Sequence, residues 1–347
     1  MHDEKRWTVV LAAGDGSRLA RWTTDRSGCV VPKQFCCLRG GRSLLRDTLV
    51  RARAVSNPDK TLVVVAARHR RHWERELHDW PQENIVVQPL NRGTAAGILL
   101  PVLTILERDP SANIAVLPSD HFVHRERILT AALETALDST RDEPGILTLL
   151  GISPDSPDND YGWIVPGEDA GKTYGVSSFV EKPHAAVALR LLQRGALWNS
   201  FIFAAKGSTL AAMYQHQFPE LLARFQLAFE GSVGSRAMEL ERLYGQMSTD
   251  DFSRGLLQNC HDRLRVVRVP DCGWTDLGTP QRVQDCLHSL PMRAFAPSAG
   301  TLVELENCVV VPGSRRARGL QEPIPLQNRT TPYDLAATGP ITRAALP

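Results

Sequence analysis

Residues 9–19, Val-Val-Leu-Ala-Ala-Gly-Asp-Gly-Ser-Arg-Leu, join an apolar run to a glycine-containing turn that ends in an arginine. The apolar run predicts a buried strand of a sheet. In the turn, glycine lets the backbone come close to an anion, and successive amide groups can form an anion-binding nest. Arg18 adds a cation that can hold two phosphate oxygens at once. We therefore predict a triphosphate-binding turn at the end of a buried strand.

Strand-like and helix-like segments alternate through the first half of the chain. Apolar and β-branched runs predict strands at residues 8–13, 61–67, 84–89 and 113–120. Amphipathic stretches predict helices at residues 43–55, 70–80, 95–108 and 125–140. Parallel strands need crossover connections, which are usually helices, so this order predicts an α/β fold with a mostly parallel mixed sheet and helices on both faces. Binding sites of such sheets form at the carboxyl ends of the strands.

The second half is expected to add further strands and helices to the same sheet. Strands are predicted near residues 145–152, 177–180, 199–205 and 264–269. A helical region at 210–247 contains Pro219 and Gly231, which predict a division into two or three helices. After residue 290 the composition changes: residues 302–311 predict one strand or hairpin, and the remainder is a proline-rich tail.

The composition excludes several classes of protein. The 347 residues are 43% hydrophobic and 22% charged, which is too apolar for a disordered chain and too weakly charged for a coiled coil. The 40 basic and 38 acidic residues nearly cancel, so the charge predicts neither nucleic acid nor an anionic membrane as a partner. The longest apolar run, Gly97–Leu106, is about half the length of a membrane span. The amino terminus is charged and the 7 cysteines include no C-x-x-C pair, so we expect a cytoplasmic protein whose cysteines are buried thiols.

Two common nucleotide-binding motifs do not fit this chain. The G-x-G-x-x-G motif of dinucleotide-binding folds requires glycine where Leu19 stands, which argues against a dehydrogenase. Gly171-Lys172-Thr173 resembles the end of a P-loop, but Pro166 replaces the first glycine of that motif and no apolar strand precedes it. The glycine turn therefore indicates another kind of phosphate-binding fold.

Pro32-Lys33-Gln34-Phe35 follows the glycine turn, and together these two segments resemble the sugar nucleotidyltransferases. The Gln-Phe pair is similar in particular to the mannose-1-phosphate guanylyltransferases. Later motifs of that family follow in the family's order and extend the resemblance over residues 8–280. They are the base-binding loop Gln88–Ala95, the metal-binding strand end Leu117–His121, the sugar loop Tyr161–Ile164, and the segments Phe179–Pro183, Trp198–Phe203 and Gly273–Gly278.

The resemblance implies a Rossmann-like nucleotidyltransferase fold that acts on GTP and a sugar 1-phosphate, in this branch mannose 1-phosphate. It implies a nucleotide site at Leu11, Ala12, Gly14, Gly16, Ser17, Arg18, Gln88, Gly93 and Thr94. It implies a sugar-phosphate site at Gly162, Glu181, Lys182 and Asn199. The expected domains are a nucleotidyltransferase domain at 1–290, with a nucleotide-binding part at 1–150 and a sugar-phosphate-binding part at 151–290, and a short C-terminal extension at 291–347.

The reaction brings two polyanions together, so it requires cations and a divalent metal before it requires a nucleophile. Asp120 and Asp276 could each be a cap or turn aspartate, but as a pair within the ordered motifs they predict ligands for Mg²⁺. Lys182 is expected to position the attacking sugar phosphate, while Arg18 and Lys33 neutralise the α-phosphate and the departing pyrophosphate. A phosphate dianion is already a nucleophile at neutral pH, so we expect a direct in-line displacement without a general base or a covalent intermediate.

Departures from the family pattern leave alternatives open. Ala12-Ala13 stands where the family has Gly-Gly, and Asn91-Arg92-Gly93-Thr94 stands where it has Gly-Arg-Asn-Thr. Another sugar 1-phosphate, such as manno-heptose 1-phosphate or glucose 1-phosphate, or another nucleotide is therefore a candidate substrate. A regulatory paralogue that binds nucleotide sugars without catalysis is a further alternative, although all five residues expected to act in catalysis are present. A homodimer is also left open.

Overall fold

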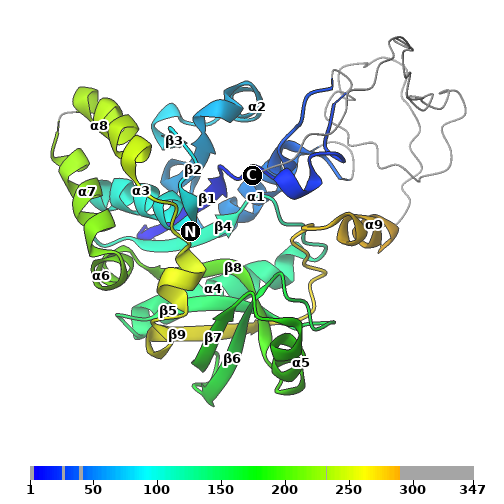
Figure 1. The fold of residues 1–347 in the computed structure, drawn as a ribbon. Helices are drawn as coiled ribbons and strands as arrows, with labels where there is room; N and C mark the ends of the chain where they lie inside the picture. The colour runs from blue at the N-terminus through cyan, green and yellow to red at the C-terminus, as the bar shows by residue number, and fades with distance from the viewer. Residues whose placement is uncertain (1–3, 26–27, 39–41, 232, 290–347) are drawn as a thin grey trace, which may run out of the picture. The chain divides into compact units, whose positions relative to one another are not determined.

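A computed structural model describes residues 4–25, 28–38, 42–231 and 233–289, which contain a nine-stranded sheet (Figure 1). The strands are β1 (Arg6–Ala12), β2 (Thr61–Ala66), β3 (Ile85–Gln88), β4 (Asn113–Pro118), β5 (Leu147–Ile152), β6 (Gly162–Asp169), β7 (Tyr174–Glu181), β8 (Leu197–Lys206) and β9 (Leu264–Val269). The α-helices are α1 (Leu44–Arg53), α2 (Arg70–Glu76), α3 (Gly93–Arg108), α4 (Glu126–Asp142), α5 (Ala185–Gln193), α6 (Gly207–Gln217), α7 (Pro219–Glu230), α8 (Val233–Gln246) and α9 (Pro280–Ser289). The strand order is β3-β2-β1-β4-β8-β5-β9-β7-β6.

The first half of the sheet is parallel, as the alternation of strands and helices predicts. β1 pairs in parallel with β2 and with β4, and β2 pairs in parallel with β3. β2 and β4 are buried along their whole length, because a strand inside a parallel sheet is covered on both faces. This burial explains why their sequences are almost continuously apolar.

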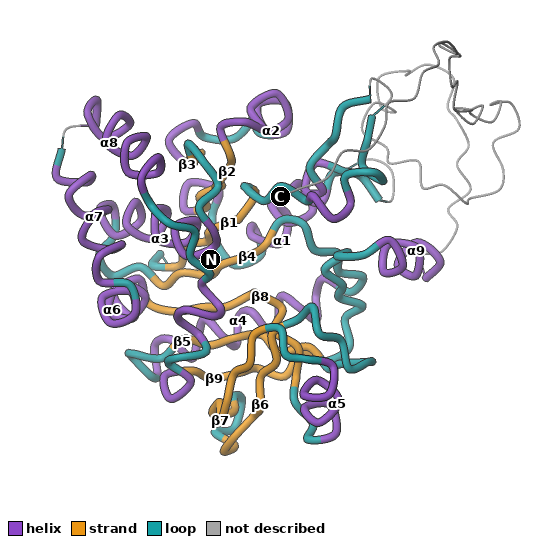
Figure 2. Tube along the Cα trace, in the orientation of Figure 1, coloured by secondary structure: helices purple, strands orange, loops and turns teal. Residues whose placement is uncertain are grey.

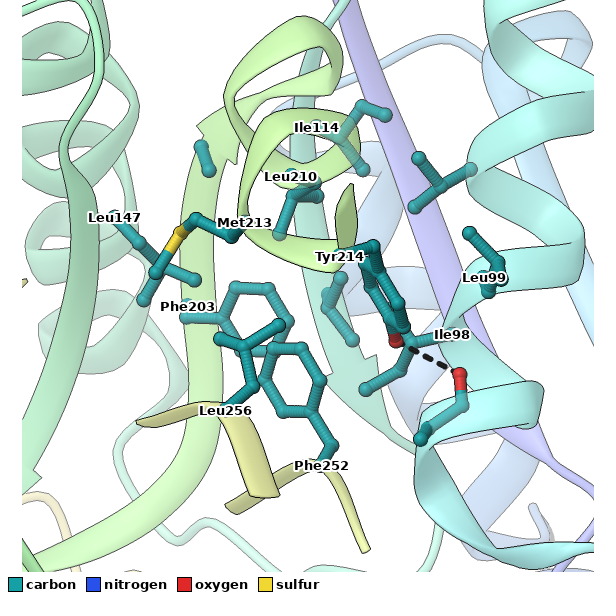
Figure 3. Close-up of a cluster of buried hydrophobic side chains, with 14 of the residues drawn as sticks. Ile98, Leu99, Ile114, Leu147, Phe203, Leu210, Met213, Tyr214, Phe252 and Leu256 are labelled. Carbon is teal, nitrogen blue, oxygen red and sulfur yellow. Dashed lines mark hydrogen bonds between the residues drawn. The ribbon is translucent and has the colours of Figure 1, made fainter. Parts of the chain in front are cut away.

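Helices cover both faces of the sheet, because successive side chains of a strand point to opposite sides. Val9 lies in a core that includes residues of α3, α6, α7 and α8, and Figure 3 shows part of this core. There, Tyr214 Oη donates a hydrogen bond to the carbonyl oxygen of Ala95 at 2.7 Å, which joins α6 to the start of α3. Val10 lies in the opposite core, together with residues of α1, α2 and α4. The predicted α/β fold with helices on both faces is confirmed.

The second half of the sheet, whose strands are orange in Figure 2, contains mainly antiparallel pairs. β8 lies between β4 and β5 and runs antiparallel to both, while β5 and β9 form a further parallel pair. β6 and β7 are antiparallel, since strands joined by a short turn pair in this way. The sequence predicts a loop at Tyr161–Ile164, whereas Gly162 begins β6. The register of β6 shifts at Pro166, which disrupts the strand pattern in the sequence.

The helical region predicted at 210–247 consists of three helices. Pro219 begins α7 and Gly231 caps its carboxyl end, so both residues divide the region as predicted. In the part of the chain that the structure describes, no helix combines the length and the apolar character that a bilayer crossing needs. The predicted extension at 291–347, with its strand or hairpin at 302–311, lies outside the described residues.

Candidate active site

The glycine turn after β1 is held in place by the motif that follows it. Gln34 is buried, and its Nε2 donates hydrogen bonds to the carbonyl oxygens of Ala12 at 2.9 Å and Gly14 at 2.8 Å. Gly16 has a φ of +60°, and a Cβ at this position would lie only 3.0 Å from the backbone nitrogen of Lys33. Position 16 therefore requires glycine both for its conformation and for the close approach of Lys33.

The turn exposes several of the residues predicted to bind phosphate. Gly14, Ser17 and Arg18 are exposed, Leu11 is half-buried and Ala12 is buried. The Arg18 side chain is 59% exposed, and its Nη1 and Nη2 lie 3.5 Å from Asp160 Oδ2 and 3.8 Å from Asp276 Oδ2. The guanidinium thus reaches from the glycine turn toward a predicted metal ligand, which is a suitable place for a cation that contacts phosphates.

Lys33 joins the two predicted metal ligands. Its Nζ lies 2.8 Å from Asp120 Oδ2 and donates a hydrogen bond of 2.5 Å to the main-chain oxygen of Asp276. Asp120 follows β4, and the nearby Phe122 exchanges backbone hydrogen bonds of 2.9 and 3.0 Å with Thr275. This bridge holds the two aspartate-bearing segments side by side, and one ammonium group contacts the side chain of Asp120 and the main chain of Asp276.

Both aspartates are ionised at neutral pH. Burial acts to raise the pKa of Asp120, but the Lys33 ammonium and His121 outweigh it and bring this pKa to about 2. Burial also acts to raise the pKa of Asp276, whereas His121, Arg282 and Lys33 lower it overall. Mg²⁺ commonly binds one or two carboxylates and completes its shell with waters and substrate phosphates, so this pair fits Mg²⁺. Nowhere in the described residues do three or more His, Cys, Asp or Glu side chains converge as a larger metal cluster.

Gly162 brings the backbone close to two predicted sugar-binding side chains. A Cβ at this position would lie 2.5 Å from Glu181 Oε2 and 3.3 Å from Asn199 Cβ. Asn199 is buried, and its Oδ1 accepts a hydrogen bond from the backbone nitrogen of Phe201 at 3.0 Å. Trp198, on the same strand, packs against the Tyr161 ring at a centroid distance of 4.6 Å and belongs to the core. The absence of a side chain at Gly162 therefore keeps the carboxyl group of Glu181 and the amide of Asn199 close to the backbone.

Glu181 and Lys182 present two different groups at the end of β7. The Glu181 side chain is 9% exposed, and burial together with the charge of Asp251 raises its pKa to about 7. The Lys182 side chain is 55% exposed, and its Nζ lies 3.9 Å from Glu181 Oε1. Lys182 has a φ of +47°, which is uncommon for a residue with a side chain, and its backbone nitrogen donates to the Tyr161 carbonyl at 3.2 Å. This strained turn presents an exposed cation, predicted to bind phosphate, beside a carboxyl group that can accept hydrogen bonds from hydroxyls.

The predicted base-binding residues Gln88, Gly93 and Thr94 lie at the end of β3 and the start of α3. Gln88 is buried, and its Nε2 donates to Tyr244 Oη at 3.0 Å. Asn91 Nδ2 donates to Asp15 Oδ2 at 3.2 Å, which places this loop beside the glycine turn. The two segments predicted to hold the nucleotide are therefore neighbours in the fold.

The segment Asp250–Gln258 contacts both of the predicted substrate regions. Thr94 Oγ1 accepts a hydrogen bond of 2.8 Å from a backbone amide of the segment. Gly93 has a φ of +82°, and a Cβ there would overlap the carbonyl oxygen of the first residue of the segment. At the other end, the Gln258 side chain accepts a hydrogen bond of 3.0 Å from the backbone nitrogen of Glu181. Sequence reasoning missed this segment, because it lies outside the motifs that carry the resemblance.

The chain is similar to known proteins over most of its length. A family model described as nucleotidyl transferase matches residues 7–290. The chain belongs to the nucleotidyl transferase family. It is 30% identical to the mannose-1-phosphate guanylyltransferase of Escherichia coli strain K12 over 295 residues, which cover 80% of this chain and 59% of that protein. It is 31% identical to the xanthan biosynthesis protein XanB of Xanthomonas campestris over 279 residues, which cover 78% of this chain and 57% of that protein.

This nucleotidyl transferase thus spans less than two thirds of the length of these curated relatives. Among solved structures, one named mannose-1-phosphate geranyltransferase, from Thermus thermophilus, matches with a TM-score of 0.69 and 30% identity, covering 83% of this chain and 80% of that chain. A UDP-glucose pyrophosphorylase bound to UDP-glucose matches with a TM-score of 0.53 and 15% identity over 83% of this chain and 98% of that chain, which shows a shared fold. These similarities confirm the resemblance derived from the sequence motifs.

Three residues of this nucleotidyl transferase support the site although they were not among the predicted site residues. Gln34 fixes the glycine turn, and the hydroxyl of Tyr161 and the guanidinium of Arg282 donate to the carboxylate of Asp276. Gln34 and Tyr161 lie inside quoted motifs, so a signal for them was present. Arg282 lies in α9, beyond the last motif, and only the three-dimensional structure reveals its contact.

Proposed function

We propose that this nucleotidyl transferase transfers GMP from GTP to mannose 1-phosphate, giving GDP-mannose and pyrophosphate in a Mg²⁺-dependent in-line displacement. The observation that carries the proposal is the position of Lys33, whose ammonium contacts both Asp120 and Asp276. Arg18 Nη2 lies 3.8 Å from the same Asp276. Cations and carboxylates that alternate in this way suit a reaction between two polyanions.

The cationic side chains divide the phosphate groups between them. Arg18 and Lys33 extend from the glycine turn and from the segment packed on it, so they bind the α-phosphate and the departing pyrophosphate of the nucleotide. Lys182 is exposed at the end of β7 and orients the attacking phosphate of the sugar. The attacking oxygen already carries a negative charge, so no side chain has to remove a proton from it.

Asp120 and Asp276 are the residues that would hold the Mg²⁺ ion. When bound there, the ion would supply positive charge that offsets the negative charge of the phosphates. The Lys33 ammonium contacts the carboxylate of Asp120 and the main-chain oxygen of Asp276. When the nucleotide phosphates draw Lys33 away, the carboxylate oxygens of Asp120 become available, so Lys33 exchanges one anionic partner for another during substrate binding.

The sugar ring is held by groups that suit a polyol. Glu181 accepts hydrogen bonds from two hydroxyls when it is ionised, and Asn199 can both donate and accept. Gly162 lets the ring approach the backbone, because a Cβ there would occupy the space next to Glu181 and Asn199. The choice of mannose 1-phosphate is supported by the names of the relatives, such as the protein of Escherichia coli.

Transfer between a different nucleotide and sugar 1-phosphate is the second candidate function, and the base-binding loop is the observation that supports it. The loop has Asn91 and Gly93 in an order that departs from the family, and Gln88 is buried against Tyr244. These differences affect the residues that would recognise the base. They motivate a test with other nucleotides and with manno-heptose 1-phosphate and glucose 1-phosphate.

The test is to mix the purified full chain with Mg²⁺, each of four nucleoside triphosphates and a panel of sugar 1-phosphates, and to measure pyrophosphate release. We expect the highest kcat/KM with GTP and mannose 1-phosphate. A preference for another pair would support the second candidate. Absence of pyrophosphate release with every pair, while nucleotide sugars still bind, would refute the proposal and favour a regulatory paralogue.

A further inference from the structure

The carboxylate of Asp276 uses its two oxygens unequally. Oδ1 accepts three hydrogen bonds, from Tyr161 Oη at 2.8 Å, from the backbone nitrogen of Gly278 at 2.9 Å and from Arg282 Nη1 at 2.9 Å. Within the described residues, Oδ2 receives only the approach of Arg18 Nη2 at 3.8 Å. Three donors on one oxygen fix the plane of the carboxylate and leave Oδ2 directed toward Arg18.

Arg282, from the first turn of α9, is itself held on three sides. Its Nη1 donates to Asp276, its Nη2 forms an ion pair with Asp158, and its guanidinium lies 4.3 Å from the centroid of the Tyr161 ring. The planar fork of arginine can bind two carboxylates and stack on an aromatic ring at the same time, whereas lysine offers a single flexible ammonium. The contacts therefore depend on the shape of arginine as well as on its charge.

An ordinary surface ion pair that attaches α9 to the domain is the simpler explanation of these contacts. Two observations argue for a more specific role. The side chains of Arg282 and Asp276 are only 16% and 13% exposed, so water screens their interaction weakly. In addition, Lys33 binds the main-chain oxygen of Asp276, so Arg282 and Tyr161 supply the side-chain hydrogen bonds that orient its carboxylate.

We propose that Arg282 is a positioning residue, which holds Oδ1 of Asp276 so that Oδ2 remains available to the divalent cation. The inference rests on the proposed function for the role of that cation in turnover. Electrostatics alone predicts the opposite effect, since a positive charge beside a metal ligand weakens cation binding. Weaker cation binding after loss of Arg282 would therefore indicate an orienting role, and tighter binding would indicate an effect of charge alone.

The experiment measures Mn²⁺ binding by the full chain, with and without GTP, by electron paramagnetic resonance of the free ion. The variants are Arg282→Lys, which keeps the charge but loses the fork, and Arg282→Gln, which loses both. The matched control is Arg125→Gln, because Arg125 pairs with the exposed Asp271 and lines the same surface hollow as Arg282. Far-ultraviolet circular dichroism and thermal unfolding establish that each variant is folded.

We expect both Arg282 variants to raise the Kd for Mn²⁺ at least about tenfold, as is typical when a residue that orients a metal ligand is lost. The Arg125→Gln control should leave the Kd unchanged. If the Arg282 variants do not fold, Tyr161→Phe removes a neutral donor to the same Asp276 Oδ1 without changing any charge, and it should raise the Kd in the same direction by a smaller factor. Unchanged or tighter Mn²⁺ binding in folded variants, or no Mn²⁺ binding by the parent protein, would overturn the inference. Mn²⁺ binding that depends on Arg282 but is accompanied by no pyrophosphate release would refute the proposed function alone.

Discussion

Replacement of Glu181 by glutamine should make the protein more stable above neutral pH, although it removes a residue of the proposed sugar site. The Glu181 side chain is 9% exposed, and burial and the charge of Asp251 raise its pKa from the ordinary 4.5 to about 7. The folded protein therefore keeps a proton on Glu181 between about pH 4.5 and 7, where the unfolded chain has lost it. Within this range the free energy of unfolding falls as the pH rises.

The size of the effect follows from the difference between the two pKa values. A difference of about 2.5 in pKa corresponds to about 3 kcal/mol, at about 1.4 kcal/mol per pKa unit. Glutamine cannot ionise, so Glu181→Gln should match the parent protein below about pH 4.5 and exceed its stability by about 3 kcal/mol above pH 7. For a domain of this size, that gain corresponds to a Tm increase of about 6 °C.

The assay is thermal unfolding of both proteins between pH 4.5 and 8.5, with Glu168→Gln as the control because Glu168 is exposed on the neighbouring strand β6. We expect the Tm difference between Glu181→Gln and the parent to grow with pH and the control to show no such trend. Turnover should move in the opposite direction, with a higher KM for the sugar 1-phosphate, because an amide cannot accept hydrogen bonds on both of its polar atoms. A Tm difference that does not depend on pH, or a loss of stability at pH 8, would refute the reasoning.

Three further substitutions test other parts of the site. Asp120→Asn should lower kcat by orders of magnitude in a protein that still folds, with a lower Tm because the ion pair with Lys33 is lost. Pyrophosphate release at the parent rate would contradict the role of Asp120 as a metal ligand. Lys33→Met should tighten Mn²⁺ binding by the nucleotide-free protein several-fold while turnover falls, because the ammonium 2.8 Å from Asp120 no longer competes with the ion. Titration with Mn²⁺ checks this, and weaker binding would argue against the proposal that Lys33 exchanges Asp120 for the nucleotide phosphates. Gly162→Ala should raise the KM for the sugar 1-phosphate at least about tenfold, since the new methyl group would lie 2.5 Å from Glu181 Oε2. Initial-rate kinetics checks this, and an unchanged KM would mean that the sugar binds elsewhere.

The sequence predicts the first half of the fold better than the second. β2 and β4 are buried on both faces, so their apolar runs are long enough to recognise without a structure. β6 is different, because its carboxyl-terminal half from Gly167 is exposed and Pro166 interrupts its register. The antiparallel insertion of β8 between β4 and β5 depends on packing between distant segments, which local patterns do not encode.

Only the site residues that lie in recognisable motifs could be predicted from the sequence. The glycine turn and Lys33 are close in sequence, and the family resemblance links them to Asp120 and Asp276. The bridge between Phe122 and Thr275 that brings these aspartates together has no signature in the sequence, because its members are ordinary loop residues. The same holds for Arg282, whose partners come from distant segments of the chain.

The contacts of Asp250–Gln258 provide a physical link between the two proposed substrate sites. The segment is tied to Thr94 at one end and to the backbone of Glu181 at the other. A displacement of this segment by an incoming nucleotide would therefore alter the surroundings of the Glu181 carboxyl group, which we propose to bind the sugar. Because such coupling is reciprocal, the factor by which the nucleotide changes the affinity for the sugar phosphate must equal the factor by which the sugar phosphate changes the affinity for the nucleotide.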